Sequence, residues 1–387
     1  MSRGPRAAGL AAALWLAVAG AGEPEPPVRL DEDGFRLAVP PYEFAFPFDH
    51  AAHPSYRTEW WYYTGHLRAG ARRFGYEVTF FRAALPVRLG APGGSAWRAR
   101  QLLFRHLALA DEGDGRFRFD DRAERQALDL AGADSTRYLV WLGEDYAGLE
   151  PDRLTHRLVG RAPEFALDLW LTPEKPPAIH GHGGVSRKSA GEGNASHYYS
   201  LTRLATRGRL ALGRDTLRVE GRSWMDHEFG SEQLRDTHAG WDWFSIQLAD
   251  GRDLMLYRLR RMGGGLDTCS SGTLVEADGR TRFVSYAEFD TGPTGEWRSS
   301  RSGAHYPSGW IVRLPREGLE LRLAPALADQ ELVAPSMGGI AYWEGSVRVS
   351  GTAGGRPVAG EGYVELTGYD GASPFQGAGL DSLRRLR

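Results

Sequence analysis

The chain has 387 residues, and its 47 basic and 49 acidic side chains leave a formal net charge of −2 at pH 7. This near balance argues against a nucleic-acid partner, which needs a strongly basic face. Cys269 is the only cysteine, which excludes an intramolecular disulfide and a metal site built from cysteines. The 50 glycines and the 12 Trp, 15 Tyr and 16 Phe are typical of short strands joined by tight turns.

The first 21 residues have the parts of a secretory signal peptide. Arg3 and Arg6 precede an apolar run at residues 7–19, and small residues follow it. The run is shorter than the about 20 apolar residues that span a bilayer. We therefore expect residues 1–21 to be cleaved and the mature chain to be secreted across the inner membrane. The chain contains only two lysines, which suggests a GC-rich bacterial genome and hence the periplasm.

Nearly every later segment alternates with a period of two, which predicts strands. Residues 59–67 and 74–82 alternate on either side of a turn that contains glycine, and they form an expected hairpin. Residues 241–248 and 253–260 repeat this pattern, with an aromatic first strand and an arginine that closes the second. Helical periodicity is confined to a modest candidate at residues 121–131.

The repeated hairpin predicts an all-β fold of two related antiparallel units in tandem. We expect an N-terminal domain at residues 40–235 and a C-terminal domain at residues 236–387. Each is long enough for a barrel of about eight to ten strands, which closes its own edges. The segment at residues 173–194, rich in proline and glycine, is expected to form a long loop at the mouth of the first barrel.

The segment SWMDHEFG at residues 223–230 concentrates charge in an expected strand. Trp224, Asp226 and Glu228 share one face of that strand, and His227 lies on the other. Residues two apart in a strand are separated by about 6.5–7 Å, so the two acids can flank one bound group. A low-dielectric cavity would hold one of them protonated at neutral pH. We expect His227 to bond toward the neighbouring domain, although a bulge would exchange the two faces.

We predict catalytic roles for Asp226, His227 and Glu228. Acid-catalysed hydration needs a proton donor, a means of stabilising a carbocation, and a water molecule. A carboxylic acid or an imidazolium supplies the proton, and aromatic faces stabilise the cation. A buried structural network of the same three side chains remains the alternative interpretation.

Strands rich in tryptophan supply possible walls for an apolar ligand. In the second hairpin Trp241 and Trp243 share one face, and Asp242 lies on the opposite face, which we expect to be packed core with one paired acid. Such strands form core more often than ligand wall, and both interpretations stay open. The predicted ligand-binding residues are Glu59, Trp60, Trp61, Tyr198, Trp224, Trp241, Trp243 and Tyr257.

Several motifs together resemble one family. They lie at residues 58–67 (TEWWYYTGHL), 76–82 (YEVTFFR), 193–203 (GNASHYYSLTR), 221–230 (GRSWMDHEFG), 240–256 (GWDWFSIQLADGRDLML), 342–345 (YWEG) and 360–369 (GEGYVELTGY). The chain is similar to the AttH/carotenoid 1,2-hydratase-like family of secreted proteins, which are often labelled predicted hydrolases. The resemblance implies two tandem lipocalin-like β-barrels. For hydratase members it also implies addition of water across a terminal carotenoid double bond without a cofactor.

At the proposed site the sequence resembles the hydratases only in part. Asp226 and His227 match an Asp-His pair of those enzymes, which is followed by a residue and then Trp. Here Glu228 and Phe229 follow instead. An acid expected on the strand at residues 254–260 is missing, where this chain offers Tyr257 and an arginine.

Competing chemistries leave little trace in the sequence. No G-x-S-x-G motif is present, and His227 lacks the second histidine of a zincin helix. His180 and His182 could share a metal, but no third ligand is in view. We therefore predict no metal and no cofactor. The favoured function is hydration or hydrolysis of a long apolar molecule, isoprenoid- or lipid-like, by a monomer. The rival is a non-catalytic carrier that passes such a ligand to a membrane-transport assembly.

Overall fold

The structure, a computed structural model, describes residues 28–85, 100–231 and 237–371. The predicted signal peptide lies outside these residues. The described regular elements are strands and four short 3₁₀ turns, at Phe48–His50, Tyr286–Glu288, Pro315–Glu317 and Pro335–Met337. No helix of the described part is long and apolar enough to span a membrane.

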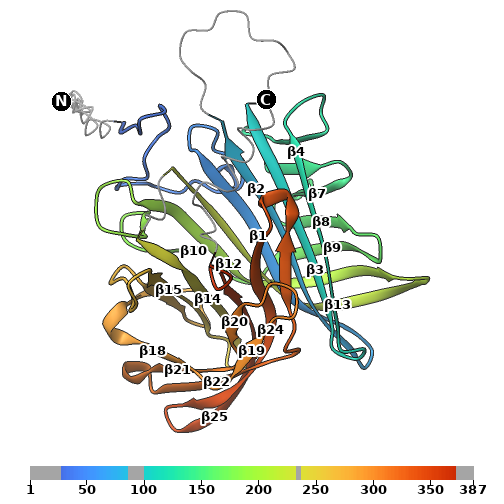
Figure 1. Cartoon of the computed structure of the whole chain (residues 1–387), viewed down its shortest axis with the longest axis vertical. Coiled ribbons are helices and arrows are strands. Elements are labelled where there is room, and N and C mark those ends of the chain that lie inside the picture. Colours follow the sequence, from blue (N-terminus) through green and yellow to red (C-terminus); the bar gives the residue numbers. More distant parts are fainter. Residues whose placement is uncertain (1–27, 86–99, 232–236, 372–387) are drawn as a thin grey trace, which may run out of the picture.

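Thirteen described strands form one antiparallel sheet, named here the N-terminal sheet (Figure 1). Their order is β4-β3-β2-β1-β13-β12-β9-β8-β7-β6-β5, and β10 and β11 pair with β12. The bounds are β1 Thr58–Ala69, β2 Arg72–Ala84, β3 Gln101–Asp111, β4 Arg116–Arg125, β5 Ala131–Ala133, β6 Leu139–Leu142, β7 Asp145–Leu149, β8 His156–Arg161, β9 Phe165–Pro173, β10 Ala178–Ile179, β11 Ser186–Arg187, β12 Ala195–Leu212 and β13 Asp215–Gly230.

Ten described strands form the C-terminal sheet, coloured from gold to red in Figure 1. Their order is β17-β16-β15-β14-β25-β24-β22-β21-β18, with β23 paired to β24. The bounds are β14 His238–Leu248, β15 Asp253–Arg261, β16 Ser271–Val275, β17 Thr281–Ser285, β18 Asp290–Pro293, β21 Trp310–Leu314, β22 Leu319–Pro325, β23 Glu331–Ala334, β24 Ile340–Ala353 and β25 Arg356–Leu366. A separate small sheet pairs β19 (Glu296–Arg298) with β20 (His305–Pro307).

The two sheets repeat one pattern of strand pairing. The hairpins β1–β2 and β14–β15 occupy equivalent places, because β1 pairs with β13 and β14 pairs with β25. Strands β13 and β25 pair in turn with β12 and β24. The prediction of an all-β chain built from two tandem antiparallel units is confirmed. The helix suggested at residues 121–131 is wrong, because the first part of that segment belongs to β4, which pairs along its length with β3.

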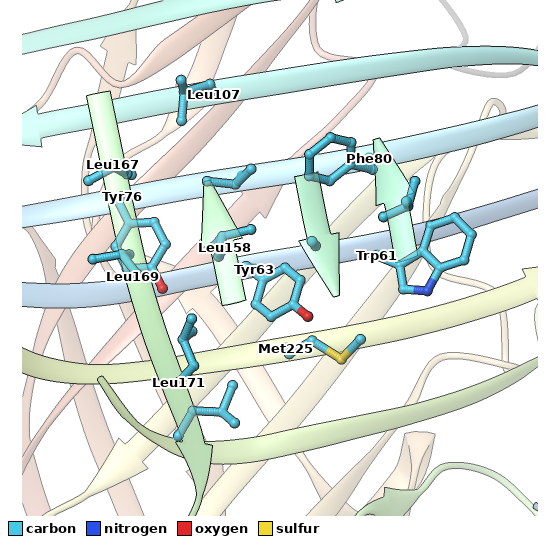
Figure 2. Close-up of a cluster of buried hydrophobic side chains, with 14 of the residues drawn as sticks. Trp61, Tyr63, Tyr76, Phe80, Leu107, Leu158, Leu167, Leu169, Leu171 and Met225 are labelled. Carbon is cyan, nitrogen blue, oxygen red and sulfur yellow. The ribbon is translucent and has the colours of Figure 1, made fainter. Parts of the chain in front are cut away.

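Each sheet packs one face into its own hydrophobic core. Figure 2 shows the N-terminal core, in which Trp61, Tyr63 and Phe80 face leucines of β8 and β9. In the C-terminal sheet Phe244 and Ile246 are fully buried in a second core, so the face that also carries Asp242 packs inward as expected. Each buried side chain of this size stabilises the fold by about 1.5–3 kcal/mol. The alternate residues of the same strands face the space between the sheets.

Candidate functional site

A cavity lies where the two sheets face each other, with β1 and β2 in contact with β25 and β24. The N-terminal half supplies Trp60, Tyr62, Thr79, Phe81, His106, Lys188, Tyr198, Asp226 and Glu228. The C-terminal half supplies Trp241, Trp243, Tyr257, Leu259, Ala334, Met337, Ile340, Tyr342, Glu365 and Thr367. A wall made mostly of aromatic and aliphatic side chains, with a smaller number of polar groups, is the usual composition of a small-molecule site.

A row of polar side chains crosses the N-terminal sheet along this cavity. Strand register aligns, from β12 to β4, Ser200, Asp226, Tyr62, Thr79, His106 and Asp121. Neighbouring strands lie about 4.8 Å apart, so Asp226 and His106 are separated by about 14 Å along the sheet. The N-terminal wall of the cavity therefore has two polar ends.

Asp226 forms the first polar end. Its Oδ2 accepts a hydrogen bond from the Tyr198 hydroxyl at 2.6 Å, and its Oδ1 accepts from Trp224 Nε1 at 2.6 Å and from the Ser200 hydroxyl. It forms no ion pair with any described residue. Burial raises the pKa of Asp226 to about 7, although these three donors act in the opposite direction. A carboxyl group with this pKa can both donate and accept a proton near neutral pH.

His180, from the long loop, supports Asp226 through Ser200. Its Nε2 lies 2.6 Å from the Ser200 hydroxyl, and its Nδ1 lies 2.8 Å from the Thr273 hydroxyl of the C-terminal sheet. Burial, assisted by the charge of nearby Lys188, holds the pKa of His180 well below its usual range. His180 is therefore a neutral imidazole that links the loop, the acid and the second sheet. His182 instead packs against the ring of Phe283.

Glu228 differs from Asp226 because it has a cationic partner. Its Oε1 lies 2.8 Å from Lys188 Nζ and accepts a hydrogen bond from the Ser196 hydroxyl. The ammonium also lies over the rings of Tyr198 and Tyr257, 4.9 and 4.5 Å from their centroids. Burial disfavours this charge, but the Glu228 carboxylate outweighs burial and raises the pKa of Lys188. Glu228 is thus half of a buried ion pair, whereas Asp226 is an acid without a counter-ion.

The C-terminal sheet brings a second such acid, Glu365, which the sequence reasoning did not select. Its Oε2 accepts a hydrogen bond from Trp241 Nε1 at 2.7 Å, and burial raises its pKa to about 7. Glu365 pairs with Trp243 as Asp226 pairs with Tyr62, so the two acids occupy equivalent places in the two units. It forms no ion pair among the described residues.

Two further buried acids lie close to Glu365. Glu344 is its direct neighbour on β24 and accepts a hydrogen bond from the Tyr62 hydroxyl. Burial, together with the charges of Glu365 and Glu77, raises the pKa of Glu344 well above its usual range. Burial also raises the pKa of Glu77 to about 8. Both acids are therefore largely protonated at neutral pH.

Glu59, Trp61 and His227 lie on the opposite face of the N-terminal sheet and do not line the cavity. Successive side chains alternate along a strand, so the neighbours of cavity residues point into the core. The expected bond of His227 toward the other domain is wrong. Its Nε2 lies 2.9 Å from Glu59 Oε1 and its Nδ1 lies 3.1 Å from the Tyr199 hydroxyl, both within the N-terminal sheet.

Glu59 is the centre of a buried charge network. Its carboxylate accepts a hydrogen bond from Arg82 Nε at 2.8 Å and lies 2.9 Å from His53 Nδ1. The possible ligand atoms of His53, Glu59 and His227 all lie within 4.8 Å of one another. The Arg82 guanidinium already neutralises the carboxylate and would repel a metal cation. These contacts favour a structural role for this group.

The remaining predicted ligand-binding residues belong to the cavity or support it. Those that line it are Trp60, Tyr198, Trp241, Trp243 and Tyr257. Trp224 is buried behind this wall, where its indole donates to Asp226 and its ring lies 6.1 Å from that of Trp243.

These features define a class of protein, an all-β chain of two tandem units with an aromatic cavity that contains unpaired acids. The AttH-like family model matches residues 37–369, so the chain belongs to the AttH-like family. No curated protein matches the chain.

Three solved structures share the fold. A candidate AttH protein of Nitrosomonas europaea is 35% identical, with a TM-score of 0.77, over 86% of this chain and 99% of that chain. Kievitone hydratase of Nectria haematococca is 15% identical, with a TM-score of 0.66, over 89% and 97% of the two chains. CghA is also 15% identical, with a TM-score of 0.52, over 89% and 99%. The expected lipocalin-like fold is thereby confirmed, and it is shared with a hydratase.

Proposed function

We propose that this protein is a hydratase or hydrolase that acts on an apolar, isoprenoid- or lipid-like molecule without a cofactor. The observation that carries the proposal is the pair Asp226 and Glu365. Asp226 is buried and Glu365 is partly buried, and neither has an ion-pair partner among the described residues. Both enter one cavity, lined by aromatic rings, from equivalent places on the two sheets. Kievitone hydratase, which has the same fold, supports this reaction class.

Asp226 is the proposed acid. In its protonated form it transfers a proton to one carbon of a double bond, and the π electrons form the new C–H bond. Positive charge then develops on the adjacent carbon. The ring faces of Trp60, Trp241 and Trp243 stabilise such a charge through their quadrupoles.

Glu365 is the proposed base. Its carboxylate removes a proton from the water molecule that attacks the cationic carbon, so alkene and water become an alcohol. Asp226 regains a proton and Glu365 loses one to solvent, which restores the starting state. The pKa values of both groups, each about 7, allow one to be protonated while the other is ionised.

The proposed location is the periplasm, and the proposed state is a monomer. The predicted signal peptide at residues 1–21 supports the location. The rival function, a carrier that passes the ligand to a membrane-transport assembly, uses the same aromatic wall but no proton transfer.

Native ligand and turnover can be tested together. The protein is purified from its own host, its bound lipid is identified by mass spectrometry, and that lipid is returned to the protein in water enriched in heavy oxygen. A product that contains one heavy oxygen atom supports the hydratase. A lipid that binds and dissociates unchanged identifies a carrier, and protein free of lipid that binds no apolar probe contradicts both.

A further inference from the structure

A second hollow lies on the outer face of the N-terminal sheet, remote from the aromatic cavity. Its charged lining residues are Arg157, Arg161, Asp168 and Arg209. Their neighbours along the strands, such as Leu158 and Leu210, are buried in the N-terminal core, so the hollow opens on the other face. In Figure 1, β7, β8 and β9 lie on the side of the N-terminal sheet away from the C-terminal strands. Along β12, Arg209 is about 30 Å from Ser200, which supports Asp226.

The hollow exists because short side chains lie between long ones. Strand register places Arg161, Ala166 and Ala211 in one row across β8, β9 and β12. In the next row on the same face, Asp168 lies beside Arg209. The two alanine methyl groups leave room between the longer side chains of both rows. A small ligand that enters this space is therefore contacted from several sides.

Arg157 is held in place at one side of the hollow. Its Nη2 lies 2.5 Å from Asp168 Oδ1, and its guanidinium lies over the ring of Trp170, 3.4 Å from the centroid. Three arginines and one aspartate line the hollow, which leaves a net charge of +2. Because Asp168 already pairs with Arg157, the two remaining cations are Arg161 and Arg209.

Arg161 has only weak partners. It lies 3.6 Å from Glu144, but that carboxylate is 84% exposed, and water screens such a pair. Asp145 is 4.0 Å from Arg161 and already forms an ion pair with Arg105 at 2.9 Å. The positive charge of Arg161 is therefore largely uncompensated.

Arg209 has no ion-pair partner among the described residues and faces a like charge instead. Its direct neighbour on β13 is Arg218, which also lacks an ion pair within the described part of the chain. Like charges that lie directly opposite on neighbouring strands are destabilising. An anion bound beside Arg209 would relieve this repulsion.

We propose that this hollow binds an anionic group of the phosphate class, with Arg161 and Arg209 as its main ligands. The hydroxyl group of Thr216 lines the same hollow and adds a neutral donor. Donors that approach from several sides are best satisfied by a group with three or more acceptor oxygens, and arginine binds such oxygens with two parallel N–H groups. The phosphate can belong to a small soluble molecule or to a lipid headgroup. This site is independent of the proposed reaction.

The double variant Arg161→Gln/Arg209→Gln removes both proposed ligands. The matched control is Arg322→Gln/Arg356→Gln, which removes two exposed arginines of the C-terminal sheet that form no ion pair with any described residue. The single variant Arg209→Gln tests whether Arg209 is structural. In chloride buffer its melting temperature should be at least that of the wild type, because the repulsion with Arg218 is removed. A lower melting temperature would overturn the site.

The probes are inorganic phosphate and vesicles of phosphatidylglycerol, with phosphatidylcholine vesicles as the neutral comparison. Phosphate affinity is measured from the rise in melting temperature at constant ionic strength, and vesicle binding is measured by flotation. We expect the wild type and the control pair to bind phosphate, and the double variant to bind it at least about tenfold more weakly. Binding to phosphatidylglycerol that the double variant also loses identifies a lipid headgroup, whereas binding of free phosphate alone identifies a soluble ligand.

Three results would overturn the site. They are a wild type that binds neither phosphate nor phosphatidylglycerol, a double variant that binds as well as the wild type, and an equal loss in the control pair, which would indicate general charge attraction. Each of these results leaves the proposed function intact, because the hollow is separate from the aromatic cavity.

Discussion

The difference in unfolding free energy between Glu77→Gln and the wild type should shift in favour of the variant as the pH rises from 5 to 7.5. Glu77 is buried, and one of its carboxylate oxygens, Oε2, has no hydrogen-bond partner among the described residues. Burial raises its pKa from 4.5 to about 8. Between these values the folded state holds a proton that the unfolded state releases, so stability falls as pH rises. Over the about 2.5 units from pH 5 to pH 7.5 this loss is about 3 kcal/mol, at about 1.4 kcal/mol per unit.

Urea unfolding of the wild type and Glu77→Gln at pH 5 and pH 7.5 measures this loss directly. Glutamine does not titrate, so the difference in unfolding free energy between variant and wild type should grow by about 3 kcal/mol in favour of the variant. Glu361→Gln is the matched control. Although burial opposes it, the nearby His66 and the bonds from Arg73 and Arg68 lower the pKa of Glu361 to about 2, so its contribution should not change over this range. A Glu77→Gln difference that is the same at both pH values would refute the reasoning.

Three other predictions follow from the placement of side chains on the two faces. Glu59→Gln should lower the unfolding free energy by about 3–5 kcal/mol, because it leaves Arg82 buried without its partner, and ligand affinity per folded molecule should not change. Urea unfolding and calorimetry on the same samples check this, and a loss of affinity at unchanged stability would place Glu59 in the site. Trp243→Ala should weaken the binding of an apolar probe by about 1–3 kcal/mol, measured by calorimetry, because it removes part of the cavity wall. The control variant Trp310→Phe changes a core residue and should leave the affinity for the probe nearly unchanged. The pH profile of kcat/KM should be a bell centred at about pH 7. Activity should fall at high pH because Asp226 loses its proton, and at low pH because Glu365 gains one. A profile that falls on one side only would contradict the acid–base pair.

The fold was predictable where a local pattern determines it. Alternation correctly assigned Asp226 and Trp243 to faces opposite His227 and Asp242, because side-chain direction in a strand depends only on sequence parity. The prediction of a helix at residues 121–131 is wrong because the hydrogen-bonded pairing of β4 with β3, which extends to Arg125, outweighs a weak helical pattern.

The site was only partly predictable, because its second half depends on pairing between distant strands. His106 and Tyr342 meet across 236 positions of sequence, and no local pattern links them. Glu365 did leave a signal, since the repeat of GRSWMDHE in GEGYVELT aligns it with Asp226. A residue-by-residue alignment of the two repeats therefore identifies Glu365 as the counterpart of Asp226. Asp226 and Glu228 have different roles because Lys188 forms an ion pair with Glu228 and not with Asp226. Lys188 lies on a loop, so the pattern of the strand itself does not reveal this difference.

Turnover and binding of Asp226→Asn, measured beside Glu228→Gln on the same samples, test the central claim most directly. Asparagine keeps the shape but has no acidic proton to supply. With its amide oxygen at the Oδ1 position it keeps the hydrogen bonds from Trp224 and Ser200, and its NH₂ group faces the Tyr198 oxygen. We predict that Asp226→Asn lowers turnover of the native lipid by about 10²–10⁴-fold while affinity and melting temperature stay close to those of the wild type. Glu228→Gln, which leaves Lys188 without its partner, should mainly lower the melting temperature. A stable Asp226→Asn protein with unaltered binding and turnover would show that proton transfer does not occur at this carboxyl group.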